Sequence, residues 1–384
     1  MARILFVHNF FPGQFGFLAA ALVGAGDDVV ALGGKTATDL PGVSLVRWHH
    51  KRGTTPNILP AAIRAEADMI IGNPGWGETL YLKELWPDAR LILHAEFFYG
   101  TAGSELGFDP EFGEATLAER CRAVSKGATL ALAYTQADQL VSPTPFQANR
   151  LPQSLRSRLA IIHEGVDLQP VQPAPEAAVT IGTKTFSRSR PLVTFASRVL
   201  EPLRGCHTFF RSLPKILEEV PDAEIVIAGE ETGVGYGASP PDNETWKSHF
   251  WKEIEGKVDA SRIHFVGWLP NETLNALMSI SSAHVYLTYP FVLSWSLLEA
   301  MACEALVIAS DTPPLRDVIV DGENGILVDF LSPDQLSEAV IAALRHPDHF
   351  MEVRHAARKT ILKHYDRNEI CLPQWLDIIR SVSA

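Results

Sequence analysis

Two arginines stand where a phosphate group could be held. Arg198 and Arg204 flank the segment VLEPL, which follows an apolar run at residues 191–197 and precedes a predicted helix at residues 206–219. Each guanidinium can grip two phosphate oxygens, and the free N–H groups at the start of a helix add to the attraction. Two solvated surface arginines are the simpler alternative for these residue types. Their position between a strand end and a helix start favours an anion site.

A single carboxylate interrupts the apolar segment PFVLSWSLLEAM at residues 290–301. Ser294 is predicted to cap a helix that begins at Trp295, and apolar residues almost surround the axis of this helix, which predicts that it is buried. A carboxylate in apolar surroundings is unfavourable without hydrogen-bond donors. Glu299 is therefore expected to find its donors in the hydroxyl groups of a ligand.

Polar residues also follow predicted strands in the first half of the chain. His94 and Glu96 end the run RLILHAE, and Asn73 follows the run MIIG. Gly13 and Gln14 lie in the Pro-Gly turn after the first run, where a glycine lets the backbone approach a ligand closely. The alternatives are a histidine that is satisfied within the structure and a glycine that the turn geometry requires. These residues are candidates to line a ligand site beyond the ends of the strands.

Two further segments are assigned no chemistry. GEETGVGYG at residues 229–237 follows a strand but is not followed by GK[ST], so it is interpreted as a flexible loop and not as a phosphate cradle. HEGVD at residues 163–167 is interpreted mainly as a turn in which the chain crosses. The sequence contains neither an Asp-x-Asp motif nor a cluster of Cys and His, so no metal or cofactor is expected.

The elements that must position these residues alternate between short apolar runs and helical segments. Such alternation predicts parallel sheets covered by helices on both faces, with ligands beyond the carboxyl ends of the strands. The predicted fold class is therefore α/β with two Rossmann-like, doubly wound domains that face a central cleft. The first domain is expected at residues 1–168, a linker at residues 169–189 and the second domain at residues 190–366. The predicted strands lie at residues 2–8, 29–33, 69–72, 90–96, 130–135, 191–197, 223–229, 262–267, 283–289, 305–310 and 325–330, and the predicted helices include residues 78–86, 206–219 and 271–280.

Composition and charge exclude several classes of protein. The formal net charge of −12 argues against a general affinity for nucleic acid. Apolar residues at 46% and charged residues at 20% are ordinary for a globular protein. Apolar runs are too short to span a membrane, and polar residues interrupt the N-terminal run too early for a signal peptide, so the cytoplasm is expected. A small basic cluster at Lys184, Arg188 and Arg190 could touch a membrane surface, or it could be a solvated linker.

The order and spacing of several segments resemble the retaining glycosyltransferases of family four, which have the GT-B fold. The resemblance covers nearly the whole chain. It implies transfer of a sugar from a nucleoside diphosphate sugar to a hydroxyl of a glycan or glycolipid acceptor, without a metal. It is carried by FPGQFGFLAAALVGAGDDVV near the N-terminus, GVD at residues 165–167, an Arg-x5-Arg-Gly pattern that starts at Arg198, FVGWLP at residues 265–270, LLEAMACEALVIAS at residues 297–310 and DGENGILV at residues 321–328.

The resemblance also implies a role for each candidate residue. Arg198 and Arg204 would hold the diphosphate and act in catalysis, with Arg204 in the place of the usual lysine. Glu299 would accept hydrogen bonds from the ribose, and His94 would act on the transferred sugar. Residues 367–384 would form a helix that packs back on the first domain. The other implied contacts are Gly13, Leu269, Ser294 and Trp295 with the donor, and Gln14, Asn73, Glu96 and Phe291 with the sugar or the acceptor.

Phe291 marks the main departure from the family pattern. The family pairs two acids eight positions apart, and Phe291 stands where the first acid is expected. That acid ordinarily contacts hydroxyl groups of the transferred sugar, so the identity of the sugar is left open. In addition, Pro313 and Pro314 replace an expected pair of glycines, and Asp317 stands where Glu is common. A sugar-nucleotide-binding subunit without transferase activity and a GT-B sugar-nucleotide epimerase are the alternative functions.

Overall fold

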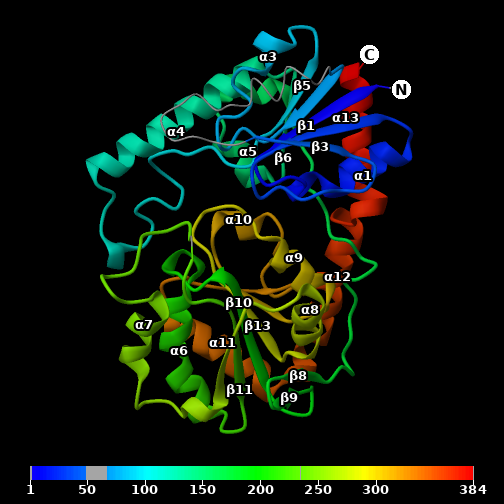
Figure 1. Ribbon diagram of the computed structural model, residues 1–384. Helices are drawn as coiled ribbons and strands as arrows, with labels where there is room; N and C mark the ends of the chain where they lie inside the picture. Colours follow the sequence, from blue (N-terminus) through cyan, green and yellow to red (C-terminus); the bar gives the residue numbers. More distant parts are fainter. Residues whose placement is uncertain (1, 49–66, 234, 384) are drawn as a thin grey trace. The chain divides into compact units, whose positions relative to one another are not determined.

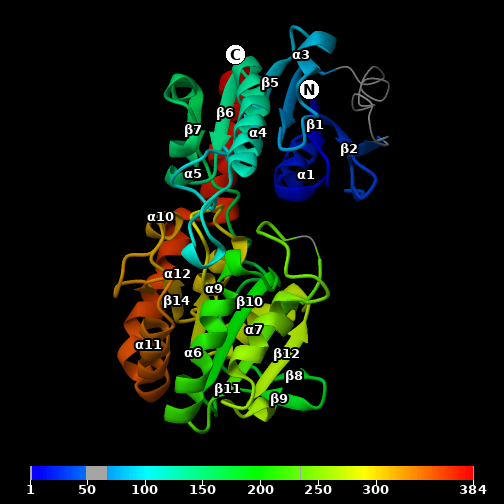
Figure 2. The same ribbon diagram turned by 90° about the vertical axis from the view of Figure 1, so that its left-hand side faces the viewer.

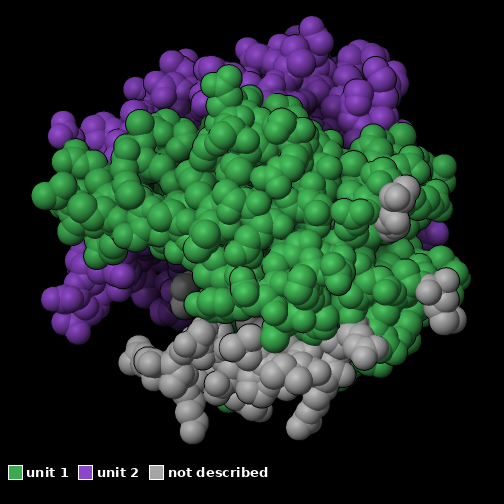
Figure 3. All heavy atoms as spheres, turned by 90° about the horizontal axis from the view of Figure 1, so that it is seen from above, with its two compact units in different colours: residues 1–106, 115–165, 367–384 green, residues 107–114, 166–366 purple. Residues whose placement is uncertain are grey.

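The computed structural model describes residues 2–48, 67–233 and 235–383, which form two compact units. Unit 1 consists of Met1–Leu106, Ala115–Gly165 and Arg367–Ala384, and unit 2 consists of Gly107–Glu114 and Val166–Asp366. Figure 3 shows unit 1 in green and unit 2 in purple. The C-terminal stretch that begins at Arg367 is part of unit 1, whereas residues 169–189, where the sequence predicts a linker, are part of unit 2.

Unit 1 is built on one parallel sheet. Its described strands are β1 (Arg3–His8), β2 (Asp28–Gly33), β3 (Ser44–Arg47), β4 (Met69–Gly72), β5 (Arg90–His94), β6 (Gln139–Ser142) and β7 (Leu159–Ile161), in the spatial order β3-β2-β1-β4-β5-β6-β7. Its described helices are α1 (Gly16–Gly24), α3 (Leu82–Leu85), α4 (Leu117–Gln136), α5 (Pro145–Arg150) and α13 (Leu372–Ser383) (Figure 1). Along β1, Ile4 and Phe6 pack with residues of α1 and α13, while Leu5 and Val7 pack with residues of α4. Both faces of the sheet are therefore covered, which explains the nearly continuous apolar runs of its strands.

Unit 2 contains a second parallel sheet. Its described strands are β10 (Leu192–Val199), β11 (Glu224–Glu230), β12 (Ile263–Gly267), β13 (Ala283–Tyr286), β14 (Val307–Ser310) and β15 (Ile326–Val328), in the order β12-β11-β10-β13-β14-β15. Its described helices are α6 (Cys206–Glu219), α7 (Trp246–Ile254), α8 (Asn271–Ile280), α9 (Trp295–Ala302), α10 (Pro313–Arg316), α11 (Pro333–Arg345) and α12 (Met351–His364) (Figure 2). Along β10, Leu192 packs with residues of α8, and Phe195 stacks on Phe209 of α6. Because side chains alternate along a strand, α6 and α8 cover opposite faces of this sheet.

A short antiparallel hairpin lies where the sequence predicts the linker. Its strands are β8 (Val179–Ile181) and β9 (Lys184–Phe186). The basic cluster around this hairpin is engaged within unit 2: Lys184 Nζ lies 2.7 Å from Glu224 Oε2, Arg190 Nη1 lies 3.7 Å from Glu224 Oε1, and Arg188 donates to the Ser279 carbonyl. Among the described residues, the helices are too short or too polar to cross a membrane.

The predicted strand at residues 130–135 is wrong. These residues form the last third of helix α4, with Leu130, Ala133 and Tyr134 buried at the spacing of one helix face. A capping box at the start of α4 marks the helix, because the Thr116 hydroxyl accepts the backbone N–H of Glu119 while the Glu119 carboxylate accepts the backbone N–H of Thr116. The strand in this part of the chain is β6, which begins at Gln139, after α4 has ended. The helix predicted at residues 78–86 is also shorter than expected, since α3 covers Leu82–Leu85.

Candidate functional site

Backbone geometry places Arg204 at the start of helix α6. A short 3-10 turn (Pro202–Arg204) follows β10, and Gly205 then adopts a left-handed conformation with φ +69° directly before α6 begins. A Cβ atom on Gly205 would lie 2.4 Å from the Cβ atom of Leu287, so a side chain does not fit here. Glycine is thus required at this position, and Arg204 is held close to the exposed N–H groups of the helix.

Hydroxyl groups from β13 and the residues after it orient the Arg204 side chain. Its Nη1 donates to the Tyr286 hydroxyl at 3.2 Å and to the Thr288 hydroxyl at 2.9 Å. The Tyr286 hydroxyl also accepts the backbone N–H of Ser294 at 3.1 Å. One phenol therefore fixes both the candidate phosphate ligand and the start of helix α9.

Helix α9 presents Glu299 on an open face. Ser294 caps the helix as predicted, since its hydroxyl accepts the backbone N–H of Ser296. The prediction that α9 is buried all round is wrong: Trp295 is 46% exposed, and Glu299, one turn further along the same face, is only partly buried. The residues on the opposite side, such as Leu297 and Met301, pack into the core. Glu299 therefore lies on the partly exposed side of the helix.

Tyr236 contacts both arginines, although no motif in the sequence marks it as a site residue. The Cζ atoms of Arg198 and Arg204 lie 5.1 Å and 5.9 Å from the centroid of the Tyr236 ring. The ring also lies 5.1 Å from the ring of Phe291, which is buried. The glycine-rich loop interpreted as flexible therefore carries a residue of the candidate anion site.

The turn after β12 carries Leu269, the candidate base contact. Leu269 is partly buried and packs against the apolar cluster that includes Leu192 and Ile280. Trp268 beside it is 65% exposed. An exposed indole at this turn offers a surface on which an aromatic base could stack, and the sequence analysis did not single it out.

In unit 1, the structure brings Gln14 close to His94 and Asn73 close to Glu96. The amide nitrogen of Gln14 lies 3.3 Å from His94 Nδ1, and Asn73 Nδ2 donates to Glu96 Oε2 at 2.9 Å. Gly13 precedes Gln14 with φ +47°, and a Cβ atom there would lie 2.5 Å from the His8 ring. The geometry of the turn is therefore enough to explain the glycine at position 13, and no ligand contact is needed to explain it.

His94 forms a buried ion pair that the sequence analysis missed. His94 Nε2 lies 2.8 Å from Glu164 Oε1, and both side chains are almost fully buried. Burial alone would lower the pKa of His94, but the hydrogen bond and the charge of Glu164 outweigh burial and raise it. Burial would raise the pKa of Glu164, but His163 and His94 lower it to about 2. The HEGVD segment thus supplies a buried counter-ion as well as a turn.

Two exposed aromatic rings lie beside this cluster. Phe10 and Trp76 are each 49% exposed, and their ring centroids are 5.2 Å apart. The His8 ring packs edge-on against Trp76 at 5.4 Å. Burial lowers the pKa of His8 to about 4, aided by the nearby His94. This part of unit 1 therefore combines exposed aromatic surface with a neutral imidazole at pH 7.

A cluster of two acids and a histidine ties residues 107–114 into unit 2. Asp109, Glu111 and His207 present donor atoms within 4.8 Å of one another, which is the composition of a possible metal site. However, His207 Nε2 lies 2.9 Å from Asp109 Oδ2, and Arg211 donates to both oxygens of Glu111 at 2.6 and 2.7 Å. A cation here would have to displace Arg211. The geometry is that of a structural ion-pair network.

Two doubly wound parallel sheets, with basic and polar side chains after their strands, define the GT-B class of glycosyltransferase folds. The structure superimposes on sucrose-phosphate synthase from Thermosynechococcus elongatus with a TM-score of 0.73 and 18% identity, over 100% of this chain and 99% of that chain. It matches Anabaena HepE in complex with UDP-glucose with a TM-score of 0.70 and 14% identity, over 99% of this chain and 100% of that chain. At these low identities the TM-scores show a shared fold, and the predicted α/β class with two doubly wound parallel sheets is confirmed.

Within that class, the chain belongs to the group 1 glycosyltransferases, as predicted. The family described as "Glycosyl transferase family 4 group" matches residues 61–171, and "Glycosyl transferases group 1" matches residues 182–360. The alpha-maltose-1-phosphate synthase of Mycolicibacterium smegmatis is 26% identical over 59% of this chain and 58% of its own length. The phosphatidyl-myo-inositol mannosyltransferase of Mycobacterium leprae is 30% identical over 56% of this chain and 51% of its own length. The chain therefore aligns with little more than half the length of these curated relatives.

Proposed function

We propose that this chain transfers a sugar from a nucleoside diphosphate sugar to an acceptor hydroxyl, with retention at the anomeric carbon and without a metal. The observation that carries the proposal is the anchored arginine: Tyr286 and Thr288 hold Arg204 at the start of α6, and Tyr286 also holds the start of α9. Two positively charged groups in a preformed geometry can stabilise a diphosphate leaving group.

The named relatives support a hexose donor. One is a maltose-1-phosphate synthase and another is a phosphatidyl-myo-inositol mannosyltransferase, while Anabaena HepE has been solved with UDP-glucose. We infer from these names a nucleoside diphosphate hexose as donor and a glycan or glycolipid as acceptor. Such a reaction suits polysaccharide or glycoconjugate synthesis.

In the proposed reaction, the bond between the anomeric carbon and the diphosphate oxygen breaks while the acceptor oxygen bonds to the same face of the sugar. The acceptor proton passes to the leaving diphosphate. Arg198 and Arg204 stabilise the charge that grows on the diphosphate, and Glu299 accepts hydrogen bonds from the ribose. The backbone N–H of Trp295 adds a donor from the start of α9.

The cluster in unit 1 is proposed to face the sugar or the acceptor. His94 is 1% exposed, and Gln14 lies 3.3 Å from its Nδ1 atom. A bound sugar would therefore meet Gln14 before His94. The exposed rings of Phe10 and Trp76 offer an apolar surface of the kind on which a sugar ring can stack.

Substitution of Arg204 tests the proposal most directly. R204A is expected to lower turnover of the donor on the order of 100-fold to 1000-fold, because it removes a preorganised charge from the leaving group. R204K, which restores the residue type usual in the resembling family, should recover part of this loss. R345A is the control, since Arg345 on α11 forms a surface ion pair with Glu219.

The assay combines calorimetric binding of UDP, GDP and ADP with release of nucleoside diphosphate from a panel of sugar nucleotides. Turnover of R204A at the wild-type rate would contradict the proposed site. Binding of a nucleoside diphosphate without turnover by the wild type would favour the non-catalytic subunit. Isomerisation of the donor without an acceptor would favour the epimerase.

A further inference from the structure

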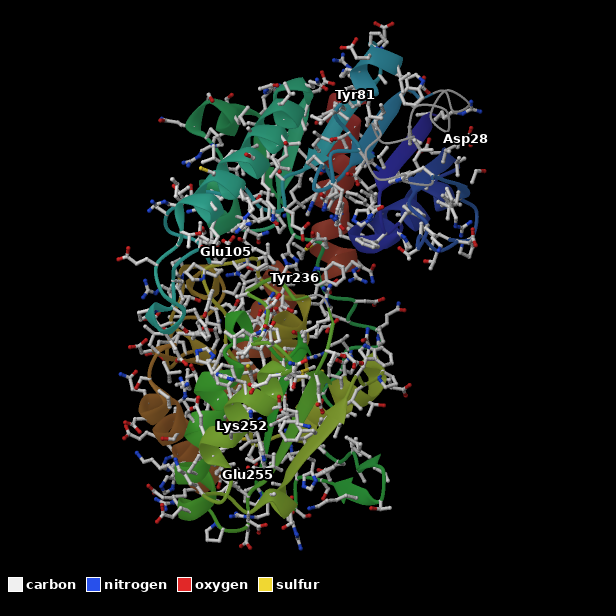
Figure 4. All side chains as sticks on the ribbon, turned by 60° about the vertical axis from the view of Figure 1, so that its left-hand side comes forward. Asp28, Tyr81, Glu105, Tyr236, Lys252 and Glu255 are labelled. Carbon is white, nitrogen blue, oxygen red and sulfur yellow. The ribbon has the colours of Figure 1, made fainter. Side chains whose placement is uncertain are left out.

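The loop that follows β11 places an aromatic ring against both candidate phosphate ligands. Tyr236, labelled in Figure 4, is 50% exposed, and the Cζ atoms of Arg198 and Arg204 lie 5.1 and 5.9 Å from its ring centroid. A cation within about 6 Å of a ring centroid is attracted by the negative face of the ring. One half-exposed tyrosine therefore contacts two cations that would otherwise repel each other.

A cation–π contact need not use the hydrogen-bond donors of a guanidinium that a phosphate needs. A guanidinium is planar and donates hydrogen bonds within its plane, where it can bind two oxygens side by side. Attraction to an aromatic ring acts on the delocalised charge and consumes none of these donors. For Arg204, one in-plane nitrogen is already bonded to Tyr286 and Thr288, so the ring adds a further restraint from another element.

A buried carboxylate holds the loop in place. Glu201 is 3% exposed, and its carboxylate accepts the backbone N–H of Tyr236 at 2.9 Å and that of Gly237 at 2.9 Å. A Cβ atom on Gly235 would lie 2.3 Å from Glu201 Oε2, so the backbone passes directly over the carboxylate. Since Glu201 stands between Arg198 and Arg204 in the sequence, one short segment carries both arginines and the anchor for the ring that contacts them.

Phe291 also packs against the Tyr236 ring. The centroids of Phe291 and Tyr236 are 5.1 Å apart with the planes inclined at 51°, and Phe291 is 3% exposed. The residue that departs from the family's acid pair thus has a local structural role. An acid at this position would replace an aromatic contact with a charge next to the ring.

We propose that Tyr236 is a positioning residue for the diphosphate, which orients Arg198 and Arg204 while Glu201 fixes its loop and Phe291 supports its ring. This inference rests on the proposed function of the arginine pair and adds to it a residue that touches the arginines and not the reacting atoms. It also assigns Phe291 a role that does not require contact with the sugar.

The test compares binding of UDP with binding of uridine, which lacks the phosphates, by isothermal titration calorimetry. Y236A is expected to weaken UDP binding, by at most about 5-fold to 30-fold if the full strength of two exposed cation–π contacts serves to orient the arginines, and to leave uridine binding unchanged. Y236L, which keeps apolar bulk without an aromatic face, should lose as much as Y236A. Y236F should restore most of the UDP affinity, and E201Q should give a smaller loss than Y236A.

Y81A is the matched control, because Tyr81 in unit 1 is also a half-exposed tyrosine, at 44% exposure (Figure 4). If the wild type binds none of UDP, GDP and ADP, the proposed function fails and the inference fails with it. If R204A loses UDP binding while Y236A binds like the wild type, the inference alone is overturned. Equal losses for UDP and uridine would assign Tyr236 to the base, and tighter binding by Y236A would make it an obstruction; either result overturns the positioning role.

Discussion

Glu78 makes unit 1 less stable as the pH rises, and replacing it should reverse that effect. The residue lies in the turn after β4 and is 4% exposed. One carboxylate oxygen accepts the backbone N–H of Trp76 at 3.0 Å, and the other is buried without a hydrogen bond of good geometry among the described residues. Burial raises the pKa of Glu78 from its usual 4.5 to about 7, against the opposing effect of backbone N–H groups.

The direction of the effect follows from where the proton is held more tightly. Between pH 4.5 and 7 the folded state retains the Glu78 proton that the unfolded state has released, so the free energy of unfolding falls as the pH rises through this window. The full penalty is present above pH 7. At about 1.36 kcal/mol per pKa unit, the shift corresponds to about 3 kcal/mol. E78Q keeps the shape of the side chain without its charge, so we expect it to raise the free energy of unfolding by about 3 kcal/mol at pH 8 and by little at pH 4.5.

His8 supplies an internal check on this prediction. Burial lowers its pKa to about 4, so its protonation destabilises the fold as the pH falls from 6.5 towards 4. The two groups therefore have opposing slopes in the wild type, and E78Q should reveal the His8 slope as a free energy of unfolding that rises with pH between 4 and 6.5. Urea unfolding followed by circular dichroism from pH 4.5 to 8 measures both effects, with E84Q on the exposed side of α3 as control. An equal gain for E78Q at pH 4.5 and pH 8 would refute the burial argument.

Two further results are expected. Enzyme treated with EDTA should retain its transferase activity, because Arg198 and Arg204 are proposed to neutralise the diphosphate; a loss that Mg²⁺ or Mn²⁺ restores would contradict the metal-free mechanism. H94N should lower the free energy of unfolding by about 3–5 kcal/mol, measured by urea unfolding at pH 7, because it leaves the buried Glu164 without its positive partner. A loss below about 1 kcal/mol for H94N would show that Glu164 is not ionised in the folded state.

The helices and strands that the sequence predicts well are those with both a clear period and clear ends. The predicted helices at residues 206–219 and 271–280 have the bounds of α6 and α8, because apolar residues such as Phe209 and Leu213 recur at one-face spacing between turn residues. Helix α4 was missed for the opposite reason. Its N-terminal half is polar on nearly every side, so only the apolar end at residues 130–135 has the pattern of a helix or a strand. The capping pair Thr116 and Glu119 was the available signal.

The hairpin of β8 and β9 shows how composition can hide a local pattern. Prolines before residue 179 suggested a linker over the whole stretch, whereas VTIGTKTF alternates apolar and polar residues around Gly182. Gly182 has φ +62°, as a two-residue hairpin turn requires. Lys184 and Arg190 could not be paired from the sequence, because their partner, Glu224, is distant in the sequence.

Contacts between loops decide the rest of the site, and a single sequence does not encode them in any period. Arg204 could be found because it follows a strand, yet its partners Tyr286 and Thr288 come from the end of β13 and the loop after it. Tyr236 lies in a loop whose glycines indicate flexibility, but those glycines let the backbone pass over the Glu201 carboxylate. The glycines therefore predict that the loop can bend sharply, but they do not predict whether other residues hold it in place.

Phe291 is another residue whose contacts cannot be predicted from a single sequence. In the family pattern the corresponding residue is an acid. In the structure, Phe291 packs against the ring of Tyr236, which contacts both arginines. An acid at position 291 would compete with the diphosphate for those arginines unless a ligand's hydroxyl groups satisfied it, whereas a buried phenylalanine leaves both positive charges to the ligand. The departure thus changes what surrounds the arginine pair without removing any charge that the proposed transfer needs.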